Sequence, residues 1–123
     1  MGPGQRAHHQ DVSVSNAAVD ASLAALADPQ RRRIVELLSE RPRRAGELAE
    51  AVGVSAPAMS RHLRTLKSGG LVVLAHPDFD ARVRIYTLRR EGMVALKQWL
   101  EQAEAMWAQQ LSSFKDHLES DGR

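Results

Sequence analysis

The chain has 123 residues, a length that fits one domain with a modest hydrophobic core. It contains no cysteine, so disulfides, thiolate metal ligands and cysteine nucleophiles are excluded. No apolar run approaches the roughly 20 residues of a membrane span, and the first residues lack the apolar core of a signal peptide. We therefore expect a cytoplasmic protein with no membrane partner.

The formal net charge is only +2, but the charges are unevenly distributed along the chain. Residues 29–67 carry +5 and residues 68–90 carry +2, whereas residues 1–28 carry −2 and residues 91–123 carry −3. A basic middle segment is what a polyanionic partner such as nucleic acid requires. Arginine-rich surfaces also occur in proteins from GC-rich genomes, so the charge alone does not establish that this segment binds nucleic acid.

Apolar spacing, prolines and glycines predict the organisation of the chain. Residues 1–16 are expected to form a disordered arm, residues 17–120 the folded domain and residues 121–123 a short tail. Within the first part of the domain, the predicted helices cover residues 19–26, 29–40, 45–52 and 56–68.

Local residues indicate where these helices begin and end. Asp28 and Ser55 are good N-caps for the second and fourth helices. Gly53 is suited to a left-handed conformation after the third helix. The third helix has only Arg44 or Ala45 at its cap position, and neither caps well, so we expect a frayed first turn there.

A β-hairpin and a long helix are predicted after the fourth helix. The runs 71–75 and 82–88 are rich in β-branched residues and flank a turn-rich segment. From about residue 91 to about residue 120, apolar residues recur at three- and four-residue steps. This spacing predicts one long helix or two nearly collinear helices.

Residues 45–67 have the plan of a helix-turn-helix motif, whose second helix enters the DNA major groove with its N-terminal end leading. That second helix carries no acidic residue. Arg61 can pair with guanine through two hydrogen bonds, whereas Arg64 and Lys67 suit phosphates. Two arginines share one face of the second hairpin strand, and we expect them, and not the acidic hairpin tip, to contact DNA. The candidate DNA-binding residues are Ser55, Ala56, Pro57, Ser60, Arg61, His62, Arg64, Lys67, Arg82 and Arg84.

The segments ALADPQRRRIVELL, GELAEAVGVSAPAMSRHLRTLKSGGLV and RIYTL, in this order, resemble the ArsR/SmtB family of bacterial winged-helix repressors. The resemblance covers about residues 19 to 118. It implies a mostly α-helical winged helix-turn-helix fold with a small β-hairpin, in the order α-α-α-α-β-β-α. It also implies a homodimer that binds a double-stranded DNA operator with two-fold pseudo-symmetry, usually to repress nearby genes.

The long last helix supports a homodimer independently of the resemblance. About 28 residues at roughly 1.5 Å each give a rod of about 42 Å, which exceeds the width of a small domain. Its apolar stripe cannot all face the core of one copy, so a partner helix is the natural cover. The first helix is expected to share this interface, as it does in the family. The candidate interface residues are Val19, Leu23, Leu26, Trp99, Ala103, Trp107, Leu111, Phe114 and Leu118.

The chain departs from the metal-sensing members of the family. The cysteine type of site is excluded, and the last helix offers only His117 beside Asp116 and Glu119, without the second cluster that such sites need. We therefore expect no metal and no cofactor. The tryptophans and methionines of the last helix leave open a small apolar effector between two copies, with plain packing as the alternative.

Two features have more than one interpretation. His62 can be a partly buried imidazole hydrogen-bonded to its neighbours, a DNA contact, or a pH or ligand sensor. In the run 31–33, at least one arginine is expected to pair within the chain, while another can reach a phosphate.

The residues distinguish three classes of function. An enzyme is disfavoured because no nucleophile–base pair and no glycine-rich phosphate loop is recognisable. A winged-helix module that binds protein instead of DNA would call for an acidic or apolar fourth helix face, which the sequence lacks. The sequence therefore predicts a dimeric, sequence-specific DNA-binding regulator, most simply a repressor of its own and neighbouring genes.

Overall fold

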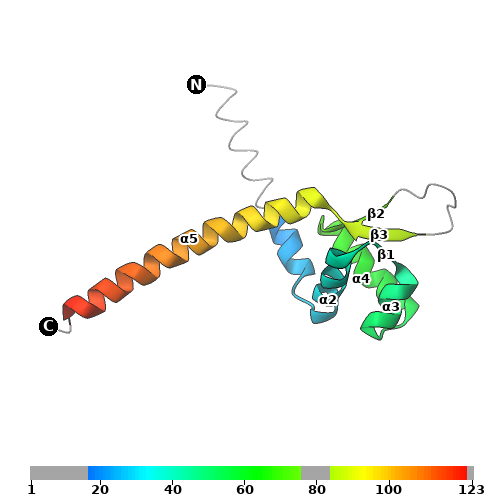
Figure 1. The fold of residues 1–123 in the computed structure, drawn as a ribbon, viewed down its shortest axis with the longest axis horizontal. Helices are drawn as coiled ribbons and strands as arrows, with labels where there is room; N and C mark the ends of the chain where they lie inside the picture. The colour runs from blue at the N-terminus through cyan, green and yellow to red at the C-terminus, as the bar shows by residue number, and fades with distance from the viewer. Residues whose placement is uncertain (1–16, 76–83, 122–123) are drawn as a thin grey trace, which may run out of the picture.

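A computed structural model describes residues 17–75 and 84–121 of the chain. A helix over residues 17–25 is followed by three further helices, a small sheet and one long helix (Figure 1). The expected arm, the hairpin tip with Asp78 and Asp80, and Arg82 lie outside the described residues. The elements are α2 (Pro29–Glu40), β1 (Arg43–Arg44), α3 (Ala45–Val52), α4 (Ala56–Ser68), β2 (Val72–Leu74), β3 (Ile85–Leu88) and α5 (Arg90–Asp121).

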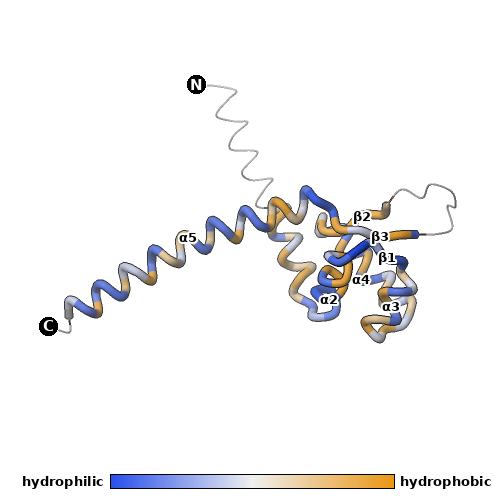
Figure 2. The backbone as a smooth tube through the Cα atoms, viewed as in Figure 1, coloured by the Kyte–Doolittle hydropathy of each residue, from blue (hydrophilic) through white to orange (hydrophobic). Residues whose placement is uncertain are grey.

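The core lies where the first helices converge beneath the start of α5. Apolar residues spaced three or four apart on each helix point inward, so each helix buries one stripe. Figure 2 shows these apolar turns gathered in the body of the molecule, whereas apolar and polar turns alternate along α5. Burying one such side chain contributes roughly 1.5–3 kcal/mol. The most deeply buried large side chains are Ile34, Leu48, Met59, Leu63, Leu66 and Leu71.

The predicted boundaries of α3 and α4 are confirmed. Gly53 follows α3 with φ +81°, a left-handed conformation that residues with a Cβ rarely adopt, and its N–H donates to the carbonyl oxygen of Ala49 at 2.9 Å. The Ser55 hydroxyl accepts from the backbone N–H of Ala58 at 3.3 Å, which satisfies one free donor at the start of α4.

The prediction of a frayed start for α3 is wrong. Arg43 and Arg44 form the short strand β1, which pairs with β3 through Tyr86 and Ile85. The Glu47 carboxylate accepts from the backbone N–H of Arg44 at 3.3 Å. This bond uses the backbone of the cap residue, so it forms whatever side chain stands at that position. Arg41 donates to the same carboxylate at 3.0 Å, and these two bonds lower the pKa of Glu47.

The strands form an antiparallel three-stranded sheet in the order β1-β3-β2. The hairpin was predicted, and its register pairs Val72 with Leu88 and Leu74 with Tyr86. The second strand is shorter than expected, because it begins at Ile85 and Arg84 stands immediately before it.

The last helix is continuous, which decides between the two alternatives for this segment. It spans 32 residues, one residue beyond the expected end of the domain, and at about 1.5 Å per residue it measures about 48 Å. Figure 1 shows it projecting from the body as a rod. None of the helices in the described residues combines the length and apolar character of a membrane span.

The start of α2 depends on Asp28, as predicted. Its carboxylate accepts from the backbone N–H groups of Gln30 at 2.7 Å and Arg31 at 3.2 Å. Partial desolvation raises the pKa of Asp28, but these two hydrogen bonds and the charge of Arg31 lower the pKa by more, so it lies below its ordinary value.

We expect Asp28→Ala to lower the melting temperature by about 3–6 °C at neutral pH. Because the pKa of Asp28 is depressed in the folded state, the carboxylate stabilises the fold above its unfolded-state pKa, and this contribution is lost as the pH falls through the folded-state pKa. Thermal unfolding from neutral pH to about pH 2–3 should therefore show the two proteins converging. Asp28→Asn keeps an acceptor oxygen and serves as the control. If the difference in melting temperature between the wild type and Asp28→Ala is unchanged in acid, the ionised Asp28 carboxylate is not what stabilises the start of α2.

Candidate nucleic-acid interface

The outward face of α4 is formed by small polar and basic side chains. Met59, Leu63 and Leu66 are buried, and the helical period turns the positions between them outward. The His62 side chain is half-buried. The remaining predicted residues on this helix and its cap are all exposed: Ser55, Ala56, Pro57, Ser60, Arg61, Arg64 and Lys67.

The arginines of α2 are occupied within the chain. Arg31 donates through Nε to the carbonyl oxygen of Ala25 at 2.6 Å, and Arg32 donates to that of Leu26 at 2.9 Å. Arg33 pairs with Glu36 at 3.3 Å. The expected internal pairing of at least one of these arginines is thus confirmed for all three.

The basic side chains of α4 differ from those of α2 in this respect. Arg61, Arg64 and Lys67 make no side-chain hydrogen bond or ion pair with another residue of the described ranges. Their guanidinium and ammonium groups therefore keep their full donor capacity for an external anion.

A hollow of about 390 Å³ lies between α4 and the start of β3. Arg84 directly precedes β3 and Tyr86 lies two residues further along, while Arg64 and Ser68 stand one turn apart on α4. Three cations from two elements therefore meet around one space, with hydroxyl groups beside them, a donor set that suits a phosphate. The lining residues are Ser60, Arg64, Lys67, Ser68, Arg84 and Tyr86.

Sequence reasoning missed Ser68 and Tyr86 in this hollow. The signal for Ser68 was its position four residues after Arg64 on the same helix face. The signal for Tyr86 was its position two residues after Arg84, although Tyr86 also belongs to the core and is only 8 % exposed.

His62 points towards α2. Its Nε2 lies 2.7 Å from Oε1 of Gln30, and its Nδ1 lies 3.4 Å from Nη1 of Arg31. The partly buried, hydrogen-bonded imidazole is thus confirmed, with two side chains of another helix as its partners. Gln30 was not predicted, because nothing in its local sequence indicates a partner 32 positions away.

The predicted interface residues divide into two groups. Val19 and Ala103 are buried within the single chain, and Leu26 and Trp99 are partly buried. Leu23 is 37 % exposed. The outer half of α5 carries a stripe of four large apolar side chains, each more than half exposed: Trp107, Leu111, Phe114 and Leu118, here called the α5 stripe.

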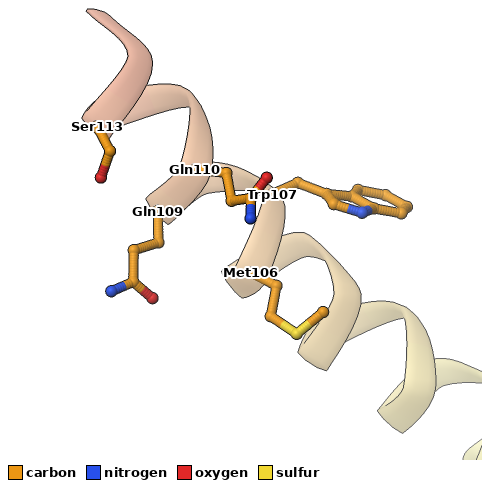
Figure 3. A pocket seen from close by; sticks show the side chains of 5 residues that line it. All are labelled: Met106, Trp107, Gln109, Gln110 and Ser113. Carbon is orange, nitrogen blue, oxygen red and sulfur yellow. The ribbon is translucent and has the colours of Figure 1, made fainter. Parts of the chain in front are cut away.

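The outer part of α5 also borders a hollow of about 530 Å³, lined by Met106, Trp107, Gln109, Gln110 and Ser113. Figure 3 shows that all five belong to this helix and that Trp107 and Gln109 leave it on opposite sides. Within the described part of the chain the hollow is therefore the open flank of a rod and not an enclosed pocket. In residues 17–75 and 84–121, no group of three or more His, Asp or Glu side chains is placed to hold a metal ion.

A helix-turn-helix followed by a β-hairpin, with the hairpin packed into a small antiparallel sheet, is a winged helix-turn-helix. The sequence model of the bacterial regulatory protein, arsR family, matches residues 28–73. The HTH-type transcriptional regulator Rv2034 of Mycobacterium tuberculosis is 38 % identical over 104 residues, covering 84 % of this chain and 91 % of that protein.

Two further comparisons agree. The transcriptional repressor SdpR of Bacillus subtilis is 40 % identical over 48 residues, covering 39 % of this chain and 53 % of that protein. The solved structure of an ArsR-like transcriptional regulator from Rhodococcus sp. RHA1 superimposes with a TM-score of 0.66 at 28 % identity, covering 82 % of this chain and 92 % of that chain. The chain belongs to the ArsR family; it is a DNA-binding transcription regulator and not an enzyme.

Proposed function

We propose that the protein is a homodimeric repressor that binds an operator with two-fold pseudo-symmetry near its own and neighbouring genes. The observation that carries this proposal is the contrast between the arginines of α2, which are satisfied within the chain, and those of α4, which are not. A related protein that is named a transcriptional repressor supports the direction of regulation.

In this proposal the N-terminal half of α4 reads bases. Ala56 and Pro57 are small enough for close approach to thymine methyl groups, and Arg61 reaches a guanine. The hollow between α4 and β3 holds a backbone phosphate through Arg64, Lys67 and Arg84, which sets the register of the protein on the duplex. The proposed DNA contacts otherwise remain those predicted from the sequence, except His62, whose ring nitrogens lie within hydrogen-bonding distance of Gln30 and Arg31.

The α5 stripe is proposed as the main contact between two copies. Leaving four large apolar side chains exposed is unfavourable, and the same stripe of a second copy covers them in an isologous contact. Two copies related by a two-fold axis present their α4 helices to successive major grooves about 34 Å apart. Binding then excludes other proteins from the operator.

The test begins with enrichment of duplexes from a random-sequence DNA library by the full chain. Affinity for the enriched duplex and for a scrambled duplex is then measured by fluorescence anisotropy at several salt concentrations. We expect at least about 1,000-fold preference for the enriched duplex, together with a steep salt dependence. Failure to enrich any duplex would overturn the sequence-specific function, and a reporter gene behind the enriched site distinguishes repression from activation.

A further inference from the structure

The helix over residues 17–25 is hydrogen-bonded to the end of α4. The Ser22 hydroxyl donates to the carbonyl oxygen of Gly69, the residue that caps α4, at 2.8 Å. Ser22 is only 4 % exposed, so its hydroxyl is buried and needs a hydrogen-bond partner within the protein. The bond satisfies a carbonyl that the helix end leaves without an intrahelical partner.

The two helices approach closely at this point. A Cβ at Gly69 would lie 3.0 Å from the carbonyl oxygen of Ala21 and 3.0 Å from the Cβ of Ala25. The backbone of α4 therefore sits directly against the helix over residues 17–25, and the Ser22 bond is made at a contact that has no room for an intervening side chain.

A second connection joins the same two elements nearer the middle of α4. Arg31 donates through Nε to the carbonyl oxygen of Ala25, and its Nη1 lies 3.4 Å from Nδ1 of His62. With the proton on Nε2, His62 donates to Gln30 and accepts from Arg31, so both ring nitrogens are used. His62 and Gly69 are seven residues apart, which is about 10 Å along the helix.

We propose that Ser22, Arg31 and His62 are positioning residues that fix the orientation of α4 relative to the helix over residues 17–25. The buried side chains Met59, Leu63 and Leu66 hold α4 against the core, and two polar connections separated along its length add a directional constraint that apolar packing lacks. Because that first helix contributes Leu23 to the proposed contact between copies, the same connections tie the separation of the two α4 helices to the dimer contact. This inference rests on the proposed function and assigns His62 to α2 in place of DNA.

The consequence for DNA binding is selective. Base contacts depend on placing side chains to within a fraction of an ångström, whereas phosphate attraction tolerates small shifts. Loosening α4 should therefore reduce the preference for the enriched duplex while leaving the affinity for the scrambled duplex and the salt dependence unchanged. Direct contact of His62 with a phosphate would instead change both affinities alike.

The experiment compares Ser22→Ala, His62→Ala and the conservative His62→Gln with the wild type. The matched control is Ser39→Ala, which removes an exposed hydroxyl bonded to the carbonyl oxygen of Val35 in its own helix. We expect Ser22→Ala and His62→Ala to lower the affinity ratio between enriched and scrambled duplexes about 10-fold. His62→Gln should restore most of the ratio, because its amide both donates and accepts, and Ser39→Ala should leave it unchanged.

Sedimentation and thermal unfolding verify that each variant remains folded and dimeric. Hydrogen exchange of the α4 amides in the free protein gives a readout that needs no DNA, and it should be faster in His62→Ala than in His62→Gln. An unchanged affinity ratio with unchanged α4 exchange would overturn the inference, as would an equal loss for both duplexes with a shallower salt slope. Failure of the wild type to enrich a duplex would count against the proposed function, while the exchange measurement would still test the inference.

Discussion

Leu111→Glu is expected to convert the protein to monomers and to lower affinity for the enriched duplex by more than about 100-fold. Leu111 lies at the centre of the α5 stripe, between Trp107 and Phe114, and is 68 % exposed in the single chain. In the proposed homodimer a carboxylate at this position would be buried in an apolar contact without a partner, which is strongly unfavourable. Each monomer would then bind one half-site, without the gain from linking two. Analytical ultracentrifugation and anisotropy measure the two effects.

Gln109→Glu provides the matched control, because it adds the same charge to the same helix. Gln109 is exposed on the side of α5 opposite Trp107 (Figure 3). We expect this variant to remain dimeric and to bind normally. If Leu111→Glu is also dimeric, the α5 stripe is not the contact between copies.

Arg61→Ala is expected to lower affinity for the enriched duplex by about 10- to 100-fold while affecting the scrambled duplex much less. The Arg61 side chain is exposed, has no partner among the described residues and lies in the half of α4 that is proposed to enter the groove. Enrichment from the random library, repeated with the variant, should show a relaxed preference at one base pair in each half-site.

Arg64→Ala makes the contrasting case, because Arg64 lines the hollow that is proposed to hold a phosphate. Its loss should weaken binding to both duplexes equally and reduce the salt slope by about one for each copy. Arg33→Ala removes the same charge from a site already paired with Glu36, and it should change neither quantity by much. Equal behaviour of all three variants would show that α4 is not the DNA-reading element.

Much of the fold was predictable because its signals are local. Asp28 and Ser55 cap helices through neighbouring backbone groups, and Gly53 ends α3 in a conformation that glycine favours. The strand β1 was missed because two residues show no periodicity, and their partners lie more than 40 positions along the chain. The prediction that α3 would fray failed because it considered only the cap side chain.

The candidate interface was predictable to the extent that helical spacing decides which side chains face outward. That spacing placed Arg61 and Arg64 on the surface. It did not show that Arg31 and Arg32 donate hydrogen bonds to backbone carbonyl oxygens. Net charge counts the arginines of α2 and α4 equally. Only the tertiary contacts show which of them remain available for DNA. The hydrogen bond between Ser22 and Gly69 could not be predicted from the sequence either, because its partners are 47 residues apart.

The rod-like α5 has a consequence for how the molecule is made. Every described side chain after Ala103 is exposed in the single chain, so this part of α5 gains no tertiary packing within one copy, and tertiary packing is the main source of helix stability in proteins. In the proposed homodimer, packing against the second copy stabilises these turns, so ordering of the rod is coupled to pairing of the subunits. On dilution, circular dichroism should then report unwinding of this segment at the concentration where the pair separates.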